Sequence, residues 1–99
     1  MPAYVIVNVR TEHPQEYERY KAMAQETIAQ YGGRYIVRGG QFEVLEGACK
    51  PTRIVVVEFP SYERALEWWH SAEYAPAKAL RQRLSTTDLL VVDGLRLTP

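Results

Sequence analysis

Residues 32–40 carry the sequence GGRYIVRGG, in which two arginines and a tyrosine stand between two glycine pairs. Three interpretations suit this composition: an RGG-type RNA-binding segment, a glycine-rich loop that cradles phosphate, or one β-strand with a turn signal at each end. The phosphate loop is excluded, because no Gly-Lys-Ser/Thr sequence follows at the spacing that a P-loop requires. The flanking segments distinguish the other two.

Short segments rich in β-branched residues predict the strands of this chain. We expect strands at residues 4–10 (YVIVNVR), 34–38 (RYIVR), 53–59 (RIVVVEF) and 88–97 (DLLVVDGLRL). Residues 41–47 (QFEVLEG) are expected to resume the second strand after Gly39 and Gly40. A glycine pair inside a strand pattern predicts a β-bulge there.

Capping signals predict helices between these strands. Pro14 is suited to a first helical position, and a glycine pair beginning at Gly32 suits the end of that helix. Ser61 is a good N-cap for a second helix at residues 62–70, and Ser71 for a further helical segment at 72–84. The resulting β-α-β-β-α-β order predicts one ferredoxin-like α+β domain over residues 1–99. Its four-stranded antiparallel sheet would carry the helices on one face.

Three of the predicted strands are apolar on both faces near their middles, in the runs VIV, IVVV and LLVV. The helices cover only one face of the sheet, so the other face would expose a large apolar patch to water. Monomeric proteins rarely tolerate such a patch. We therefore predict a homodimer that packs sheet to sheet.

Composition excludes several functional classes. The 99 residues include 12 basic and 12 acidic side chains, for a net charge of +0, whereas nucleic-acid binders usually carry a basic excess. Cys49 is the single cysteine, so an intramolecular disulfide scaffold is excluded. The N-terminal segment lacks the basic region of a signal peptide, and no apolar run suits a membrane helix. A cytoplasmic protein without membrane association is expected.

The RNA-recognition motif shares the predicted element order and is the strongest form of the RNA hypothesis. That module stacks bases on aromatic side chains of its first and third strands. When the third strand is aligned on Phe59, the stacking positions fall on Ile54 and Val56, which have no aromatic face. We therefore interpret GGRYIVRGG as a strand and expect no nucleic-acid partner.

Polar residues on the predicted strands suggest a site. Alternation places Arg38 on one strand face with Arg34, Asn8 on the mixed face of the first strand, and Glu58 on the face of Ile54. These side chains would meet the dimer partner or a cavity. A carboxylate among arginines suggests an ion pair, a substrate anchor, or both.

The segment WWHSAEY adds aromatic candidates. Helical spacing predicts a core stripe that includes Trp69, with Trp68 nearer the rim. Its other members are Tyr62 and Leu66. His70 and Tyr74 are one turn apart and are predicted to face a common cavity.

These observations give one hypothesis for a small-molecule site. Arg38 would anchor a carboxylate or enolate oxygen, because a guanidinium presents a fixed fork of donors. His70 or Glu58 would move a proton, and the remaining substrate-binding residues would be Asn8, Trp69 and Tyr74. The alternatives are an Arg38–Glu58 ion pair that seals the interface, and a non-catalytic dimeric binding or regulatory module.

We expect neither a metal nor a cofactor. The soft metal ligands are limited to His13, His70 and Cys49, and no histidine pair has i, i+4 spacing. The sequence names no substrate or reaction.

Four quoted segments together resemble the domain of unknown function 1330 family. They are GGRYIVRGG, RIVVVEFPSYERALEWWHSAEY, the basic LRQR and a terminal strand with VVDG. The resemblance implies a ferredoxin-like subunit of the dimeric α/β-barrel superfamily, which includes cofactor-free monooxygenases, haem-degrading enzymes, muconolactone isomerase and chlorite dismutase. It implies fold and assembly, and leaves the chemistry open.

Overall fold

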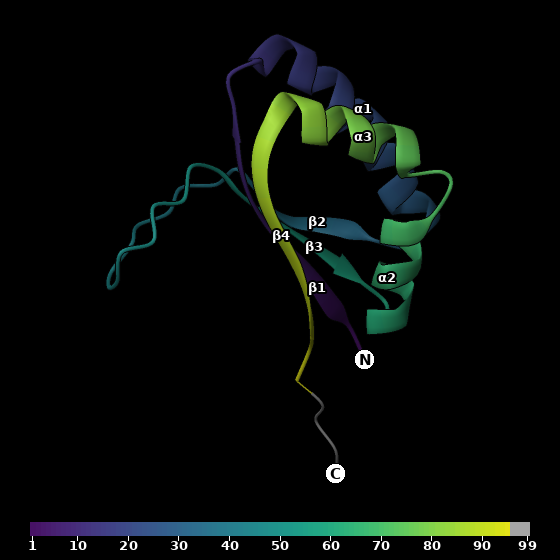
Figure 1. Ribbon diagram of the computed structural model, residues 1–99. Helices are drawn as coiled ribbons and strands as arrows, with labels where there is room; N and C mark the ends of the chain where they lie inside the picture. The colour runs from purple at the N-terminus through teal and green to yellow at the C-terminus, as the bar shows by residue number, and fades with distance from the viewer. Residues whose placement is uncertain (96–99) are drawn as a thin grey trace.

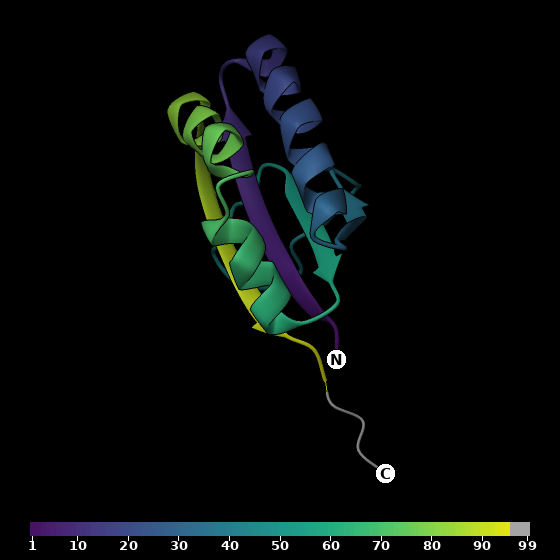
Figure 2. The ribbon, with the colours of Figure 1, turned by 90° about the vertical axis from the view of Figure 1, so that its right-hand side faces the viewer.

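A four-stranded antiparallel sheet in the order β2-β3-β1-β4 forms the centre of the computed structural model, which describes residues 1–95 (Figure 1). In chain order the elements are β1 (Ala3–Thr11), α1 (Pro14–Gln30), β2 (Arg34–Arg38), β3 (Ile54–Phe59), α2 (Tyr62–His70), α3 (Ala75–Leu84) and β4 (Ser85–Asp93). All the helices lie against one face of the sheet (Figure 2). The predicted ferredoxin-like α+β fold is confirmed.

The ends of the elements differ slightly from the prediction. β4 begins at Ser85 and ends at Asp93, and the predicted end of that strand at Leu97 lies outside the described residues. α3 begins at Ala75, after a turn in which the Ser71 Oγ accepts a hydrogen bond of 3.1 Å from the Tyr74 N–H. Within residues 1–95, none of the helices combines the length and apolarity needed to cross a membrane.

Alternating residues of the central strands form the core. On β1, Val5, Val7 and Val9 face the helices and are buried, as the uniformly apolar side of that strand predicted. On β3, Val57 and Phe59 occupy the same face. The helices complete the core with Tyr17, Ala24, Ile28, Ala65, Trp68, Ala77, Leu80 and Leu84.

The opposite face of the sheet, here called the outer face, carries a continuous apolar row. Val37 pairs with Val56, Val56 with Ile6, and Ile6 with Leu90, so that the row crosses all four strands of the sheet. Leu90 is 54% exposed, and its neighbour Val92 on the same face is 42% exposed. The sequence prediction of an uncovered apolar face is therefore confirmed for this chain.

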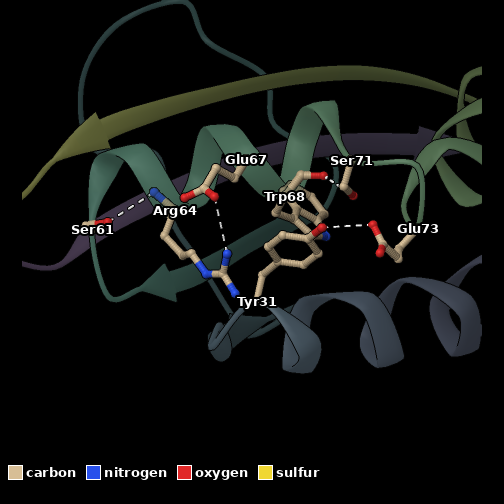
Figure 3. A network of polar contacts seen from close by, with 7 residues as sticks. All are labelled: Tyr31, Ser61, Arg64, Glu67, Trp68, Ser71 and Glu73. Carbon is tan, nitrogen blue, oxygen red and sulfur yellow. Dashed lines mark hydrogen bonds and ion pairs between the residues drawn. The ribbon is translucent and has the colours of Figure 1, made fainter.

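The tryptophan assignment on α2 was wrong by one position. Trp68 is buried and Trp69 is only half-buried, while Tyr62 is exposed. The cap fixes the start of the helix, since the Arg64 N–H donates to the Ser61 Oγ at 3.0 Å (Figure 3). The short helix then points Ala65 and its i+3 neighbour Trp68 at the sheet, so each residue lies about 100° from the predicted orientation.

β2 contains a β-bulge at Ile36, whereas the sequence analysis predicted one at Gly39 and Gly40. Tyr35 pairs with Val57 and Val37 with Val56, so Ile36 is the extra residue. Beyond it Arg38 lies opposite Val55, on the helix-facing side of the sheet. The predicted common face for Arg34 and Arg38 was therefore wrong, because the bulge interrupts the two-residue alternation.

Gly39 ends the strand and starts a projecting segment. Its φ of 73° is positive, a backbone conformation that glycine adopts readily. Residues 41–47 form no strand, which corrects the prediction that extended pairing resumes there. Residues 39–53 instead form an arm that projects away from the helices (Figure 1), with Leu45 85% exposed.

Gly39→Ala is expected to lower the free energy of unfolding by about 1–2 kcal/mol. An alanine here would have to adopt a positive φ, which is unfavourable for a residue with a side chain. Its Cβ would also lie 2.7 Å from the Arg53 Nε. Gly40→Ala is the matched control, because φ is not positive there and a Cβ would meet nothing within 4 Å. Urea unfolding of both variants measures the difference. Equal losses at Gly39 and Gly40 would contradict the assigned backbone geometry.

Candidate functional site

A polar and aromatic hollow lies between α1 and the helix-facing side of β1, β2 and β3. Its inner part has a volume of about 30 Å³, and a hollow of about 610 Å³ lies beside it at the base of the 39–53 arm. Both parts are lined by Tyr17, Lys21 and Arg53, so they are treated together as the α1 cavity. The inner part suits a water molecule or a ring edge, and the outer part is large enough for a small ligand.

Three cationic side chains line the α1 cavity. Arg38 donates from Nη1 to the Gln25 Oε1 at 3.2 Å, and its guanidinium lies 4.3 Å from the centroid of the Tyr35 ring. The Lys21 Nζ forms an ion pair of 2.6 Å with Glu18, at the mouth. Arg53 is half-buried and has no ion pair with any residue of the range 1–95. The cavity therefore carries an excess of positive charge.

Tyrosines supply the remaining polar side chains of the inner part of the α1 cavity. Burial raises the pKa of the Tyr17 phenol to about 12, although the charges of Arg81 and Arg53 oppose the shift. Burial also raises the pKa of Tyr20 and Tyr35. All three phenols are therefore protonated at neutral pH and can donate hydrogen bonds.

The floor of the α1 cavity is apolar. It consists of Val5, Val7, Val55 and Val57, together with Ile28, Trp68 and Leu89. Donors and cations on one wall, with an apolar floor, suit a flat molecule that carries negative charge or a phenolic oxygen at one end.

The family model described as "Domain of unknown function (DUF1330)" matches residues 2–95. The chain belongs to this DUF1330 family. The resemblance drawn from the four sequence segments is thereby confirmed. No curated protein sequence matches the chain.

Solved structures share the fold of this DUF1330 domain. A protein of unknown function from Rhodopseudomonas palustris is similar with a TM-score of 0.76 and 21% identity, over 97% of this chain and 84% of that one. SnoaB, a cofactor-independent oxygenase from Streptomyces nogalater, is similar with a TM-score of 0.68 and 15% identity, over 99% of this chain and 97% of that one. A putative antibiotic biosynthesis monooxygenase from Nitrosomonas europaea is similar with a TM-score of 0.60 and 19% identity, over 97% of this chain and 100% of that one. At these identities the likeness shows the fold alone.

Two of the polar residues singled out in the sequence lie on the outer face of the DUF1330 sheet. The Asn8 Oδ1 accepts a hydrogen bond of 2.9 Å from the Thr52 N–H, at the base of the arm. Glu58 accepts from the Arg34 Nε at 2.9 Å. The carboxylate thus pairs with Arg34, and the alternative Arg38–Glu58 pair does not form because the bulge places Arg38 on the other side of the sheet.

The aromatic candidates also separate. Tyr74 is fully buried, and its ring centroid lies 4.0 Å from that of Trp68. His70 is exposed at the end of α2 and lines a hollow of about 360 Å³ against β4, together with Trp69. The structure does not bring His70 and Tyr74 to a common cavity, because α2 ends at His70 and the following turn carries Tyr74 into the core.

Of the six candidates, Arg38 therefore lines the α1 cavity, and sequence reasoning missed the other polar residues there. The sequence could have predicted the position of Arg53, because it alternates with Val55 and Val57 along the strand and therefore lies on their helix-facing side. Tyr17 and Tyr20 recur with Ala24 and Ile28 at helical spacing, a pattern that indicates a core stripe and not a site.

Proposed function

We propose that this protein binds a small, partly apolar phenolic or anionic molecule in the α1 cavity and stabilises its anionic form. The observation that carries the proposal is the convergence of Arg38 and Arg53 on one cavity. Among the described residues that line either part of the cavity, Glu18 is the sole carboxylate, and it is paired with Lys21. An incoming anion would therefore meet charge that the chain itself leaves uncompensated.

The chemistry of such a site follows from its polarity. Hydrogen bonds between a guanidinium and an oxyanion are charge-assisted, and they strengthen where water is partly excluded. The phenols of Tyr17 and Tyr35 would add neutral donors, and the valine floor would hold the apolar body of the ligand. Stabilising the anion of a phenol or enol lowers its pKa in the bound state.

An enzymatic role is supported by this arrangement and by the fold shared with SnoaB, which is described as a cofactor-independent oxygenase. A protein can form the anion of a substrate with its own side chains, without a cofactor. A non-catalytic binding module is favoured by a different observation. Neither histidine lines the α1 cavity, so the residue type that most often moves protons at neutral pH is absent from its described lining.

We further propose that the working unit is a homodimer joined through the outer face. The apolar row from Val37 to Leu90 supports this, because an exposed stripe across four strands is more easily explained as an interface than as free surface. Sheet-to-sheet packing would leave the helix-covered α1 cavity of each subunit in place.

Titration with 4-nitrophenol tests the proposed site, because its phenolate absorbs visible light. We expect saturable binding, with the apparent pKa of the bound phenol lowered by about one unit or more. Arg53→Gln and Arg38→Gln should each weaken phenolate binding by about tenfold. Arg19→Gln is the control, since Arg19 is exposed on α1 and does not line the cavity. Absence of saturable binding, or equal effects of the three substitutions, would overturn the proposal.

A further inference from the structure

Arg81 is a charged residue in the buried stripe of α3. It is 4% exposed and shares that stripe with Ala77, Leu80 and Leu84. Its Nε donates to the Tyr74 hydroxyl at 3.4 Å, and its guanidinium carbon lies 5.7 Å from the Trp69 ring centroid. Within residues 1–95, no carboxylate pairs with this guanidinium.

The two terminal amino groups of Arg81 make no hydrogen bond to the described residues. No side-chain nitrogen or oxygen in that part of the chain is both fully enclosed and without a partner, so these amino groups reach open space. Arg81 lines a hollow of about 310 Å³ between α3 and β4, here called the α3 groove. It is lined by Trp69, Arg81, Gln82, Ser85, Thr87 and Leu89.

A guanidinium remains charged at every physiological pH, and burying it without a counter-charge is unfavourable. The fold nevertheless holds Arg81 in this position. The Ser85 Oγ donates to the Arg81 carbonyl oxygen at 2.7 Å and lies 2.7 Å from the Thr87 Oγ1. These contacts fix the last turn of α3 against the start of β4, beside the hollow that Arg81 lines.

We propose that the α3 groove binds a small organic oxyanion, with its carboxylate or phosphate against the terminal amino groups of Arg81. Trp69 and Leu89 would contact the apolar part of the ligand, and the side-chain amide of Gln82 would donate to a second oxygen. Lys78 adds positive charge nearby, since its Nζ lies 4.4 Å from the Trp69 ring centroid. The planar fork of donors on Arg81 matches a bidentate oxyanion.

This site is distinct from the α1 cavity. Tyr20 lines the α1 cavity and its hydroxyl lies 2.9 Å from that of Tyr74, which in turn accepts from Arg81. A buried layer of side chains therefore separates the two hollows. The tryptophans provide separate reporters, because Trp68 lines the α1 cavity and Trp69 lines the α3 groove.

The test follows the two indole N–H resonances of the ¹⁵N-labelled protein by NMR. Sodium isobutyrate and sodium phosphate are titrated separately, with sodium chloride at matched ionic strength as the reference. We expect a saturable shift of the Trp69 resonance with one or both anions, and the identity of the effective anion distinguishes a carboxylate from a phosphate ligand. Arg81→Gln should weaken this binding at least tenfold. Arg83→Gln should change it less than twofold, because Arg83 is exposed and lines a different hollow.

A second variant keeps the test valid if Arg81→Gln fails to fold. Gln82 is exposed and lines the groove, so Gln82→Glu places a carboxylate beside Arg81 without disturbing the core. We expect this variant to lose the anion response of Trp69 at least tenfold. The proposal is overturned if neither anion shifts Trp69 saturably, or if Gln82→Glu binds like the wild type. A shift confined to Trp68 would also overturn it, while supporting an anion site in the α1 cavity.

Discussion

Trp68→Ala is expected to lower the free energy of unfolding by about 3–5 kcal/mol, the usual range for removing a large aromatic side chain from a core. The Trp68 ring is 2% exposed and packs against Phe59 and Tyr74, with centroid separations of 5.4 Å and 4.0 Å. Its Nε1–H donates to the Thr27 Oγ1 at 3.1 Å. Because small domains are stable by roughly 5–15 kcal/mol, this single substitution removes a large fraction of the total.

Trp69→Ala is the matched control on the neighbouring residue. Trp69 is half-buried at the edge of the core, where its ring centroid lies 6.2 Å from that of Tyr74 and 4.4 Å from the Lys78 ammonium. We expect it to cost roughly 1 kcal/mol, the typical value for a single substitution. Urea unfolding followed by circular dichroism measures both variants. A larger loss for Trp69→Ala would show that α2 is rotated as the spacing of Tyr62, Leu66 and Trp69 had predicted.

Leu90→Glu is expected to convert the proposed dimer into monomers. Leu90 lies in the apolar row of the outer face and is 54% exposed in the single chain, so the substitution leaves the core intact. A two-fold interface contains each residue twice, and burying an unpaired carboxylate is unfavourable. The dissociation constant should rise by about 100-fold or more, equivalent to roughly 2.7 kcal/mol.

Light scattering at micromolar concentration measures this effect. The wild type should show twice the chain mass of 11.4 kDa, and Leu90→Glu should show the mass of one chain. Ala79→Glu is the control, because Ala79 is exposed on α3, on the helix side of the domain. A monomeric wild type, or a dimer that survives Leu90→Glu and dissociates with Ala79→Glu, would contradict the assignment of the interface.

The sequence predicted the order of the elements because strong local signals agree with one another. The valine-rich strands, Pro14 at the start of α1 and Ser61 before α2 all lie where the fold uses them. The end of β2 was predicted less well. Gly39 was recognised as unusual, but the chain leaves the sheet there rather than bulging and continuing.

The candidate site was harder to predict because it depends on side-chain direction. An orientation error of one position on α2 exchanged the roles of Trp68 and Trp69. Arg81 had a signal that was overlooked, because the i, i+3 and i+4 spacing of Ala77, Leu80 and Leu84 includes its position. Charged residues within such a stripe are candidates for function, since burial of a charge is rarely neutral for stability.

The looped-out residue in β2 gives the strand two geometrically possible alignments with β3 for the same amino acids. With Ile36 outside the ladder, the guanidinium of Arg38 enters the α1 cavity; with Ile36 inside it, Val37 would take that place and the arginine would turn outward. A homologue with one residue fewer at this point would keep its arginine inside, although an alignment would show a gap. A homologue of equal length with a regular strand would lose it without any substitution. For such homologues, a one-residue insertion or deletion and the strand register would decide the charge of the pocket as much as the identity of the residue at position 38.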